Sequence, residues 1–516
     1  MRITFYGAAQ AVTGSCHVVE AANKKIMIDC GLFQGNRWSR ERNYQPFAMI
    51  PKTVDYLLIT HAHIDHSGLI PKLFKHGFRG RALATEITVD LLEVMLPDSG
   101  HIQETEVERL NRKAMRAGKK LIEPIYNVED AFNCVKKIER AKYNQVIRLD
   151  ENITVRFMDA GHILGSSIVE LWVREGTEQT KLVFSGDLGA SGKPFVNEPT
   201  IIEDADYLVM ECTYGDRLHK DVGDRLEKLR AVIQQTYEKG GNLIIPAFAV
   251  ERTQDLLYDI NQLLVSDRLP PMQVYVDSPM AVAATEIFKR NYENFDQETT
   301  RLISEGDNPL TMPVLNLSST VEESRALNEI KRGAIILSAS GMADAGRIKH
   351  HLKHNLWRPE CTVLFVGFQA PGTKGQQLLS GLRSIRIHGE EVAVRADIRF
   401  IDGYSSHADQ QELLAWINAY KQKPARIFLV HGTPEALAAM ERLIREKNGI
   451  EAYAPAWQEA IELTPGVEFS PEELQRAYQA VVTRMDSFLQ SAHNHKDVER
   501  VLQQLKQLEL LLDKDS

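Results

Sequence analysis

The sequence predicts a layered α/β fold in which one domain is inserted into another, followed by a helical tail. Three observations support this prediction. Short β-rich runs alternate with turns and helical patterns through the first half of the chain. Longer helical segments take over from about residue 216, and the first pattern returns from about residue 385. The length of 516 residues is also enough for two or more domains.

The first part of the host domain, residues 1–214, is expected to be rich in strands. Its β-rich runs are RITFYGAA, KKIMIDCG, DYLLITH, NITVRFMDA, SSIVELWV, KLVFSGD and DYLVMECT. The inserted domain, residues 215–385, begins with the helical pattern DRLEKLRAVIQQTYEKG. Its strands are expected at NLIIPAF, MQVYVDS, GAIILSAS and TVLFVGF, each with a helical pattern nearby. This arrangement predicts a parallel sheet with helical crossovers.

Residues 386–466 are expected to return to the host domain, through EVAVRADIRFID and RIFLVHG. The tail, residues 467–516, starts with SPEE, which resembles a helix-capping box with proline at the first helical position. Apolar residues then recur at helical spacing, at Val498, Val501, Leu502, Leu505, Leu508 and Leu512. We expect a helix that packs on the host domain. A dimerisation hairpin, and with it a homodimer, is the alternative.

Composition excludes several classes of protein. The chain is 43% hydrophobic and 25% charged, as in soluble globular proteins, and it contains no apolar run of about 20 residues that would span a membrane. Its five cysteines are scattered, which argues against a disulfide framework and a cysteine zinc site and makes the cytoplasm the default compartment. A net charge of −9 provides no global attraction to nucleic acid, so a polyanionic substrate would need metal ions and a local basic groove.

A histidine or a carboxylate follows each of several apolar strands. These residues are Asp29, His61, His63, Asp65, His66, His162, Asp187, Glu211 and His431. Side chains at the ends of several strands can converge on one edge of a sheet. Alone, Asp29, Asp187 or Glu211 indicates only a cap or turn, and His162 a core histidine.

The segment HAHIDH, residues 61–66, is a far stronger signal, because the whole chain has only 16 histidines. Imidazoles and carboxylates without thiolates favour zinc, with manganese or iron as alternatives. The cluster together with His162, Asp187 and His431 offers seven ligands, too many for one tetrahedral ion. Two ions that share a bridging carboxylate fit better.

HAHIDH, with Asp29 upstream and His162 and Asp187 downstream, resembles the signature of the metallo-β-lactamase superfamily. Glu211 in ECTYGDR, His407 in GYSSHAD and His431 in VHG match the extra motifs of its β-CASP nuclease branch. The resemblance covers roughly residues 1–465 and is nearest to RNA-processing members that resemble the mRNA 3′-end cleavage-factor endonuclease. It implies an αββα sandwich with an inserted β-CASP domain.

The resemblance also implies roles for these residues. His61, His63 and His162 would hold one zinc ion, and Asp65, His66 and His431 the other, with Asp187 bridging them. His407 would be the general acid, supported by Glu211, and Asp29 would support the metal site from outside the ligand set. The implied activity is a zinc-dependent ribonuclease on single-stranded RNA. A hydroxide activated by two zinc ions would cut internally and leave 5′-phosphate and 3′-hydroxyl ends.

The inserted domain offers candidates for contact with RNA. ILSASGMADAGRIKHH places Ser340, Gly341 and Arg347 around an expected helix start, where backbone N–H groups can bind phosphate; an ordinary strand-to-helix turn is the alternative. Arg252 and Lys374 are similar candidates, and Lys374 does not belong to a P-loop. The run His350, His351 and His354 is expected on a solvated helix face.

Three other functions compete with the ribonuclease. A small-molecule thioesterase or lactonase would explain HAHIDH equally well, but not the inserted domain or the pair His407 and His431. A non-catalytic RNA-processing scaffold is expected to lose ligands, and this sequence keeps them all. A DNA nuclease of the same fold is the third alternative; in the family, a histidine at the position of His431 goes with RNA.

Overall fold

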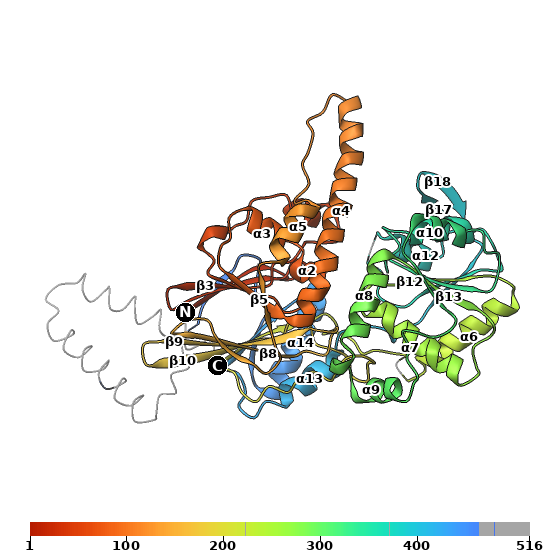
Figure 1. The fold of residues 1–516 in the computed structure, drawn as a ribbon. Helices are drawn as coiled ribbons and strands as arrows, with labels where there is room; N and C mark the ends of the chain where they lie inside the picture. Colours follow the sequence, from red (N-terminus) through yellow and green to blue (C-terminus); the bar gives the residue numbers. More distant parts are fainter. Residues whose placement is uncertain (222, 371, 464–478, 480–516) are drawn as a thin grey trace, which may run out of the picture. The chain divides into compact units, whose positions relative to one another are not determined.

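Two seven-stranded sheets and one six-stranded sheet form the framework of the protein (Figure 1). The computed structural model describes residues 1–221, 223–370, 372–463 and residue 479. The expected helical tail, residues 467–516, and the homodimer that would depend on it therefore lie outside the described residues, apart from residue 479.

The first sheet has the strand order β22-β1-β2-β3-β4-β5-β6. Its strands are β1 (Arg2–Gly7), β2 (Cys16–Ala21), β3 (Lys24–Ile28), β4 (Tyr56–Leu58), β5 (Arg81–Thr85), β6 (Ile138–Ala141) and β22 (Ala460–Glu462). The helices of this part are α1 (Arg37–Arg42), η1 (Pro51–Thr53), α2 (Ile64–Ser67), α3 (Ile70–Lys75), α4 (Glu86–Arg116) and α5 (Val128–Val135). Strand β2 is antiparallel to both β1 and β3, while β3 to β6 are parallel, so β1, β3 and β4 all end at the same edge.

The second sheet has the strand order β21-β20-β11-β10-β9-β8-β7. Its strands are β7 (Val146–Arg148), β8 (Ile153–Asp159), β9 (Ser167–Glu175), β10 (Glu178–Phe184), β11 (Tyr207–Glu211), β20 (Arg426–Val430) and β21 (Glu451–Tyr453). Helices α13 (Gln410–Asn418) and α14 (Pro434–Asn448) belong to this sheet.

A buried apolar core joins the inner faces of these two sheets. Phe5 and Ile26 of the first sheet pack in one cluster with Phe157 and Phe428 of the second, and none of them is exposed to solvent. A separate cluster joins the other face of the second sheet to the apolar faces of α13 and α14. Helix, sheet, sheet and helix thus form four layers, which is the expected αββα sandwich.

The third sheet is entirely parallel, with the strand order β14-β13-β15-β12-β16-β19. Its strands are β12 (Leu243–Pro246), β13 (Gln273–Asp277), β14 (Leu315–Ser318), β15 (Ala334–Ser338), β16 (Thr362–Phe365) and β19 (Asp397–Phe400). The accompanying elements are α6 (Arg225–Glu238), α7 (Arg252–Val265), α8 (Pro279–Arg290), η2 (Tyr292–Asn294), α9 (Gln297–Ser304), α10 (Val321–Leu327), α11 (Ile348–Asn355), α12 (Lys374–Leu379), and the hairpin β17 (Ser384–Ile387) and β18 (Glu390–Ala393). The expected parallel sheet with helical crossovers is therefore present (Figure 1).

Strand β19 differs from the expectation that the host domain resumes at residue 386. It pairs in parallel with β16, from Thr362 opposite Asp397 to Phe365 opposite Phe400. Apolar and polar residues alternate in the run VRADIRF, and this pattern suits a strand of the host domain as well as one of the inserted sheet. Only the strand with which it pairs decides which sheet it joins. The inserted sheet therefore extends past residue 385.

Two expectations from composition can be compared with the structure. All five cysteines are buried and form no disulfide. Among the helices that the structure describes, none is long and apolar enough to cross a membrane.

Candidate metal centre and nuclease site

The candidate site lies where strands of both seven-stranded sheets end. Asp29 follows β3 and His61 follows β4 in the first sheet, while Asp187 follows β10 and His431 follows β20 in the second. Strands β10, β11 and β20 are parallel, so their carboxyl ends share one edge. His162 comes from the loop between β8 and β9. The strand-end positions thus bring residues that are far apart in the sequence to one place, as expected.

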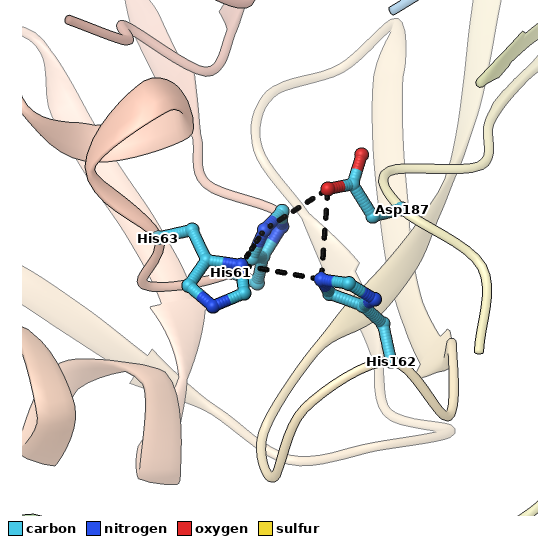
Figure 2. Close-up of side chains that lie close together, drawn as sticks. All are labelled: His61, His63, His162 and Asp187. Atoms are coloured by element: carbon cyan, nitrogen blue, oxygen red, sulfur yellow. Dashed lines mark hydrogen bonds and ion pairs between the residues drawn. The ribbon is translucent and has the colours of Figure 1, made fainter. Parts of the chain in front are cut away.

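Three histidines and one carboxylate form the first group of potential ligands, shown in Figure 2. His63 Nδ1 lies 3.2 Å from His61 Nε2 and 3.2 Å from His162 Nε2. Asp187 Oδ2 lies 3.5 Å from His61 Nε2 and 3.6 Å from His162 Nε2. The four side chains thus direct one atom each toward a common point.

Asp65, His66 and His431 form the second group. His431 Nε2 lies 3.6 Å from Asp65 Oδ2, and His66 Nε2 lies 3.3 Å from Asp187 Oδ1. Asp187 therefore faces the first group with one oxygen and the second group with the other. This is the position of a carboxylate shared between two groups of ligands.

The spacing of these atoms fits a metal ion. Zinc–nitrogen distances of about 2.1 Å at tetrahedral angles put neighbouring ligand atoms roughly 3.4 Å apart. The distances in the first group range from 3.2 to 3.6 Å. In addition, His66 Nε2, Asp187 Oδ1 and His431 Nε2 are buried and have no hydrogen-bond partner among the described residues. Buried polar atoms without partners are costly, and an ion would satisfy all three. The residues present therefore fit a metal centre.

The opposite ring nitrogens of the histidines are held by hydrogen bonds. His66 Nδ1 donates to Asp29 Oδ2 over 2.7 Å, and Asp29 in turn accepts from the backbone N–H and the hydroxyl of Thr60, both at 2.8 Å. The Thr60 hydroxyl also lies 3.0 Å from His61 Nδ1, and the Thr213 hydroxyl lies 3.0 Å from His431 Nδ1. Such partners fix the ring orientation of metal-binding histidines. Asp29 thus lies where it was expected, whereas sequence reasoning missed Thr60 and Thr213.

The backbone is strained at two of these positions. Asp29 and His431, each the first residue after its strand, have φ values of 60° and 52°. Residues other than glycine rarely adopt this left-handed conformation, and when they do they often lie at functional sites. Ala8 has a similar φ of 49°, and its carbonyl accepts a hydrogen bond from the His431 N–H over 2.7 Å.

Burial and charge set the protonation of the histidines. Burial holds the pKa of His61 and that of His162 well below 6.5 and lowers the pKa of His63 to about 4. Neutral imidazole is the form that binds metal. Burial also acts to lower the pKa of His66, but Asp187 and Asp29 outweigh it and raise this pKa well above 6.5. The carboxylates of Asp187 and Asp29 therefore favour a positive charge at the position of His66.

His407 lies beside the potential ligands but belongs to none of their groups. Its Nδ1 is 3.2 Å from Glu211 Oε1 and 3.9 Å from Asp187 Oδ2. Burial acts to lower the pKa of His407, but the carboxylates of Glu211 and Asp187 outweigh it and raise this pKa above 6.5. His407 therefore tends to carry a proton, as a general acid must.

Glu211 could also be counted as a ligand, because it forms a third group with Asp187 and His431. Its oxygens, however, are already engaged. Oε1 accepts from the Leu188 N–H over 2.7 Å and faces His407, while Oε2 accepts from the Thr213 N–H over 3.2 Å. These bonds fix the carboxylate toward His407.

The loop that carries His407 is attached to the loop that carries Asp187. A β-bridge joins Gly189 to His407, and the Ala190 N–H donates to the Ser406 carbonyl. The same carbonyl lies 3.2 Å from His162 Nδ1 and orients that imidazole. His219, which the sequence did not single out, contacts the carbonyl of His407 through Nε2 at 2.8 Å.

The inserted domain contacts the site through buried charges. Glu251 accepts a hydrogen bond from the N–H of Leu164, two residues beyond His162. Lys193, which follows the Asp187 loop, forms a buried ion pair with Asp255 of α7 at 2.6 Å. Two loops of the host domain that bear potential ligands are thus fixed to the start of α7.

The arginines and the lysine expected to bind RNA have partners within the protein. Arg347 pairs with Asp277 over 2.8 Å and donates to the carbonyls of Ser318 and Ser319. Arg252 is buried and donates to the carbonyl of Val366. Lys374 lies 3.5 Å from Asp344.

The turn that follows β15 is folded on itself. The hydroxyl of Ser340 accepts from the Ala345 N–H, and Gly341 is buried against Phe248. None of the five candidates for contact with RNA lies in the ligand groups.

The three histidines of α11 do not share one solvated face. His350 and His354 are exposed, but His351 is fully buried and its Nε2 lies 2.6 Å from Asp277 Oδ2. The expectation was therefore wrong for His351. A buried carboxylate, which the sequence pattern alone does not reveal, binds its ring.

Comparisons with known proteins agree with this architecture. Residues 9–115 match the metallo-beta-lactamase superfamily, residues 253–378 match the Beta-Casp domain, and residues 391–455 match the Zn-dependent metallo-hydrolase RNA specificity domain. The chain is 38% identical over 444 residues to ribonuclease TTHA0252 of Thermus thermophilus, covering 86% of this chain and 96% of that protein. It is 28% identical over 480 residues to transcription termination factor FttA of Methanosarcina mazei, covering 90% and 72%.

A crystal structure of a protein of unknown function from Enterococcus faecalis shares the fold. It covers 90% of this chain and 99% of its own, with a TM-score of 0.51 and 14% identity.

These matches show that the protein belongs to the β-CASP branch of the metallo-β-lactamase superfamily, as the motifs indicated. It is accordingly a metal-dependent hydrolase of the nuclease type.

Proposed function

We propose that the protein is a zinc-dependent ribonuclease that cleaves single-stranded RNA with two metal ions. The observation that carries the proposal is the position of Asp187, whose two oxygens face two separate groups of ligand atoms. The sets His61, His63, His162 and Asp65, His66, His431 are assigned to one ion each, with Asp187 shared. Seven ligand side chains are more than one tetrahedral ion can use.

The metal ions would supply a nucleophilic hydroxide at neutral pH and positive charge for the phosphate oxygens. The chain's own residues account for the other half of the reaction. His407 is oriented by Glu211 through Nδ1, which leaves Nε2 to deliver a proton to the leaving 3′ oxygen. Glu211 holds the proton on the imidazole through its charge. Breakage of the bond between phosphorus and the 3′ oxygen gives 3′-hydroxyl and 5′-phosphate ends.

The burial of the site favours a single strand over a duplex. His61, His162, Asp187 and Glu211 are at most 2% exposed. A phosphate must therefore enter a recessed position to reach them. A flexible single strand can bring one phosphate inward, whereas a rigid duplex keeps its backbone on the outside of a wide cylinder.

The choice of RNA over DNA or a thioester draws on the relatives. One relative is named a ribonuclease, and residues 391–455 match a domain whose description includes RNA specificity. The His407–Glu211 pair also favours a leaving group that needs a proton, such as a sugar hydroxyl, over a thiolate, which leaves without one.

The test is parallel incubation of metal-loaded protein with labelled single-stranded RNA, duplex RNA, single-stranded DNA and a thioester. We expect single-stranded RNA to be cut fastest, with about two zinc ions per chain by elemental analysis. Faster turnover of DNA or thioester, or a single ion in fully loaded protein, would reject the assignment.

Circular RNA separates internal cleavage from attack on the ends. We expect the circle to be cut, because cleavage that begins within the chain needs no free end. The product ends are read by treatment with a 5′-phosphate-dependent exonuclease, which should degrade them. A circle that survives while linear RNA of the same sequence is degraded would restrict the enzyme to exonucleolytic cleavage.

A further inference from the structure

An exposed cluster of aromatic rings around one arginine lies beside the metal-binding loops. Arg42, at the end of α1, places its guanidinium carbon 4.4 Å from the ring centre of Trp457, 5.4 Å from that of Trp38 and 5.5 Å from that of Phe33. Trp38 is 72% exposed and Trp457 is 40% exposed. We call these four residues the aromatic cluster.

A pocket opens at this cluster. Phe33, Arg42 and Trp457 line it together with Cys16, Cys30 and Lys72, and its water-accessible volume is about 80 Å³. This space admits the edge of a planar group but not a whole nucleotide. Any larger ligand would therefore rest its remaining surface on the exposed rings at the mouth.

One hydrogen-bond donor of Arg42, the Nε–H group, has no partner among the described residues. The Nε atom is buried and makes no hydrogen bond within the part of the chain that the structure describes. By contrast, Arg347 of the inserted domain donates to a carboxylate and to carbonyl oxygens. Arg252, whose Nε also lacks a partner among the described residues, donates through Nη1 to the Val366 carbonyl. Leaving a buried charged donor unpaired is costly, so a ligand that accepts a hydrogen bond at Arg42 would recover this energy.

The loop that carries the cluster is fixed before any ligand arrives. Asn43 closes it, because its side chain accepts from the Phe33 N–H and donates to the Phe33 carbonyl, at 2.9 and 2.7 Å. Lys72 of α3 then donates to the Asn43 carbonyl over 2.8 Å. The Trp457 indole N–H donates to the carbonyl of Tyr6 over 2.8 Å. Rings held in this way lose little freedom when they bind.

The cluster lies at the same edge as the proposed metal site. Phe33 packs over Gly7 and Gly14, since a Cβ at either glycine would come within 3.4 Å of its ring. Gly7 precedes Ala8, whose carbonyl holds the His431 N–H. On the other side, the Leu32 N–H donates to the Ile64 carbonyl, at the start of α2, the short helix that carries Asp65 and His66.

We propose that the aromatic cluster is a stacking site for a base of single-stranded RNA, one or a few nucleotides from the bond that is cut. Exposed indoles and a guanidinium plane are the surfaces on which unpaired bases stack. The Arg42 side chain would in addition donate to the base edge or to a neighbouring phosphate. The positive charge of Arg42 also suits a polyanion on a chain whose net charge is −9. This inference rests on the proposed ribonuclease function.

The test compares Trp38→Ala and Arg42→Gln with two matched controls. Phe132→Ala removes another exposed ring, 47% exposed, from α5, and Arg40→Gln removes a charge from the same short helix as Arg42. Trp38→Ala carries little risk to folding because the indole is mostly exposed. Alanine substitution of a stacking residue weakens binding about 5- to 150-fold. We expect this increase in KM for single-stranded RNA, with kcat nearly unchanged and wild-type values in both controls.

Two further readouts separate stacking from a general structural effect. RNA that carries 2-aminopurine near the cleaved bond should lose fluorescence on binding the wild type but much less on binding Trp38→Ala. A nitrophenyl phosphodiester, which has no base near the cluster, should be hydrolysed by both variants at the wild-type rate.

The outcomes distinguish this inference from the proposed function. If the wild type cleaves RNA and Trp38→Ala and Arg42→Gln keep the wild-type KM and the same 2-aminopurine quenching, the stacking site is refuted. If the wild type neither binds nor cleaves RNA but hydrolyses the phosphodiester, the proposed function itself fails.

Discussion

Replacement of His407 by alanine tests the separation of acid catalysis from metal binding. His407 belongs to none of the groups of potential ligands among the described residues, and its Nδ1 lies 3.9 Å from Asp187 Oδ2. The variant should therefore keep both metal ions. Loss of a general acid lowers the rate about 10²- to 10⁴-fold, which corresponds to about 3–5 kcal/mol of activation free energy. The side chain is 22% exposed, so water can fill the space that it leaves and the fold should persist.

The assay measures zinc content and kcat on two substrates with the same protein preparation. Single-stranded RNA has a leaving group that needs a proton, whereas the nitrophenolate of a nitrophenyl phosphodiester leaves without one. We expect the full loss on RNA and less than about a tenfold loss on the phosphodiester. His101→Ala, on the exposed surface of α4, is the matched control and should change neither value. Equal losses on both substrates, or zinc content that falls with the rate, would refute the role of His407 as the acid.

Three other substitutions test the rest of the site. His431→Ala removes a buried side chain that the proposal assigns to the second zinc ion, so zinc content should fall from about two to about one per chain and activity on both substrates should be lost together; unchanged zinc content would contradict this role. Asp29→Asn weakens the support of His66 Nδ1, and metal affinity measured by chelator competition should fall about 10- to 100-fold, whereas an unchanged affinity would make Asp29 purely structural. Glu211→Gln removes the charge that raises the pKa of His407 against the effect of burial. The protonated acid is then lost at lower pH, so the alkaline limb of kcat should move to lower pH, and a limb that stays in place would disprove the coupling.

The convergence of the potential ligands His61, Asp187 and His431 could be predicted because each of them follows the end of a strand. An apolar run followed by histidine or aspartate indicates a strand, and it indicates that the polar residue lies at the carboxyl end of that strand. Parallel strands bring such ends to one edge within a sheet, and the packing of the two sheets then brings the edge that bears His61 beside the edge that bears Asp187 and His431. This is why His61, Asp187 and His431 converge although they are spread over most of the chain.

The partners of these ligands could not be predicted in the same way. Thr60 and Thr213 hold imidazoles through hydroxyl groups, and Ser406 does so through a carbonyl. Each contact depends on the orientation of a side chain or loop after folding, and neither serine nor threonine is rare enough to stand out. Sequence also cannot tell a paired arginine from an unpaired one. Arg347 has the surroundings of a phosphate ligand in the sequence, yet in the structure its guanidinium is bound to Asp277.

Gly31 connects the aromatic cluster to α2, the short helix that carries the potential ligands Asp65 and His66. This glycine lies between Cys30, whose N–H donates to the His66 carbonyl, and Leu32, whose N–H donates to the Ile64 carbonyl. A Cβ at Gly31 would lie 1.6 Å from the carbonyl oxygen of Asp65, so the segment around Gly31 and α2 approach as closely as their backbones allow. Two residues further on, Phe33 enters the aromatic cluster. A base stacked on the cluster would therefore be held against the same backbone that positions Asp65 and His66. Stacking on the cluster would thus add binding energy beside the proposed metal site, and because this contact is the same before and during cleavage it would lower KM without changing kcat.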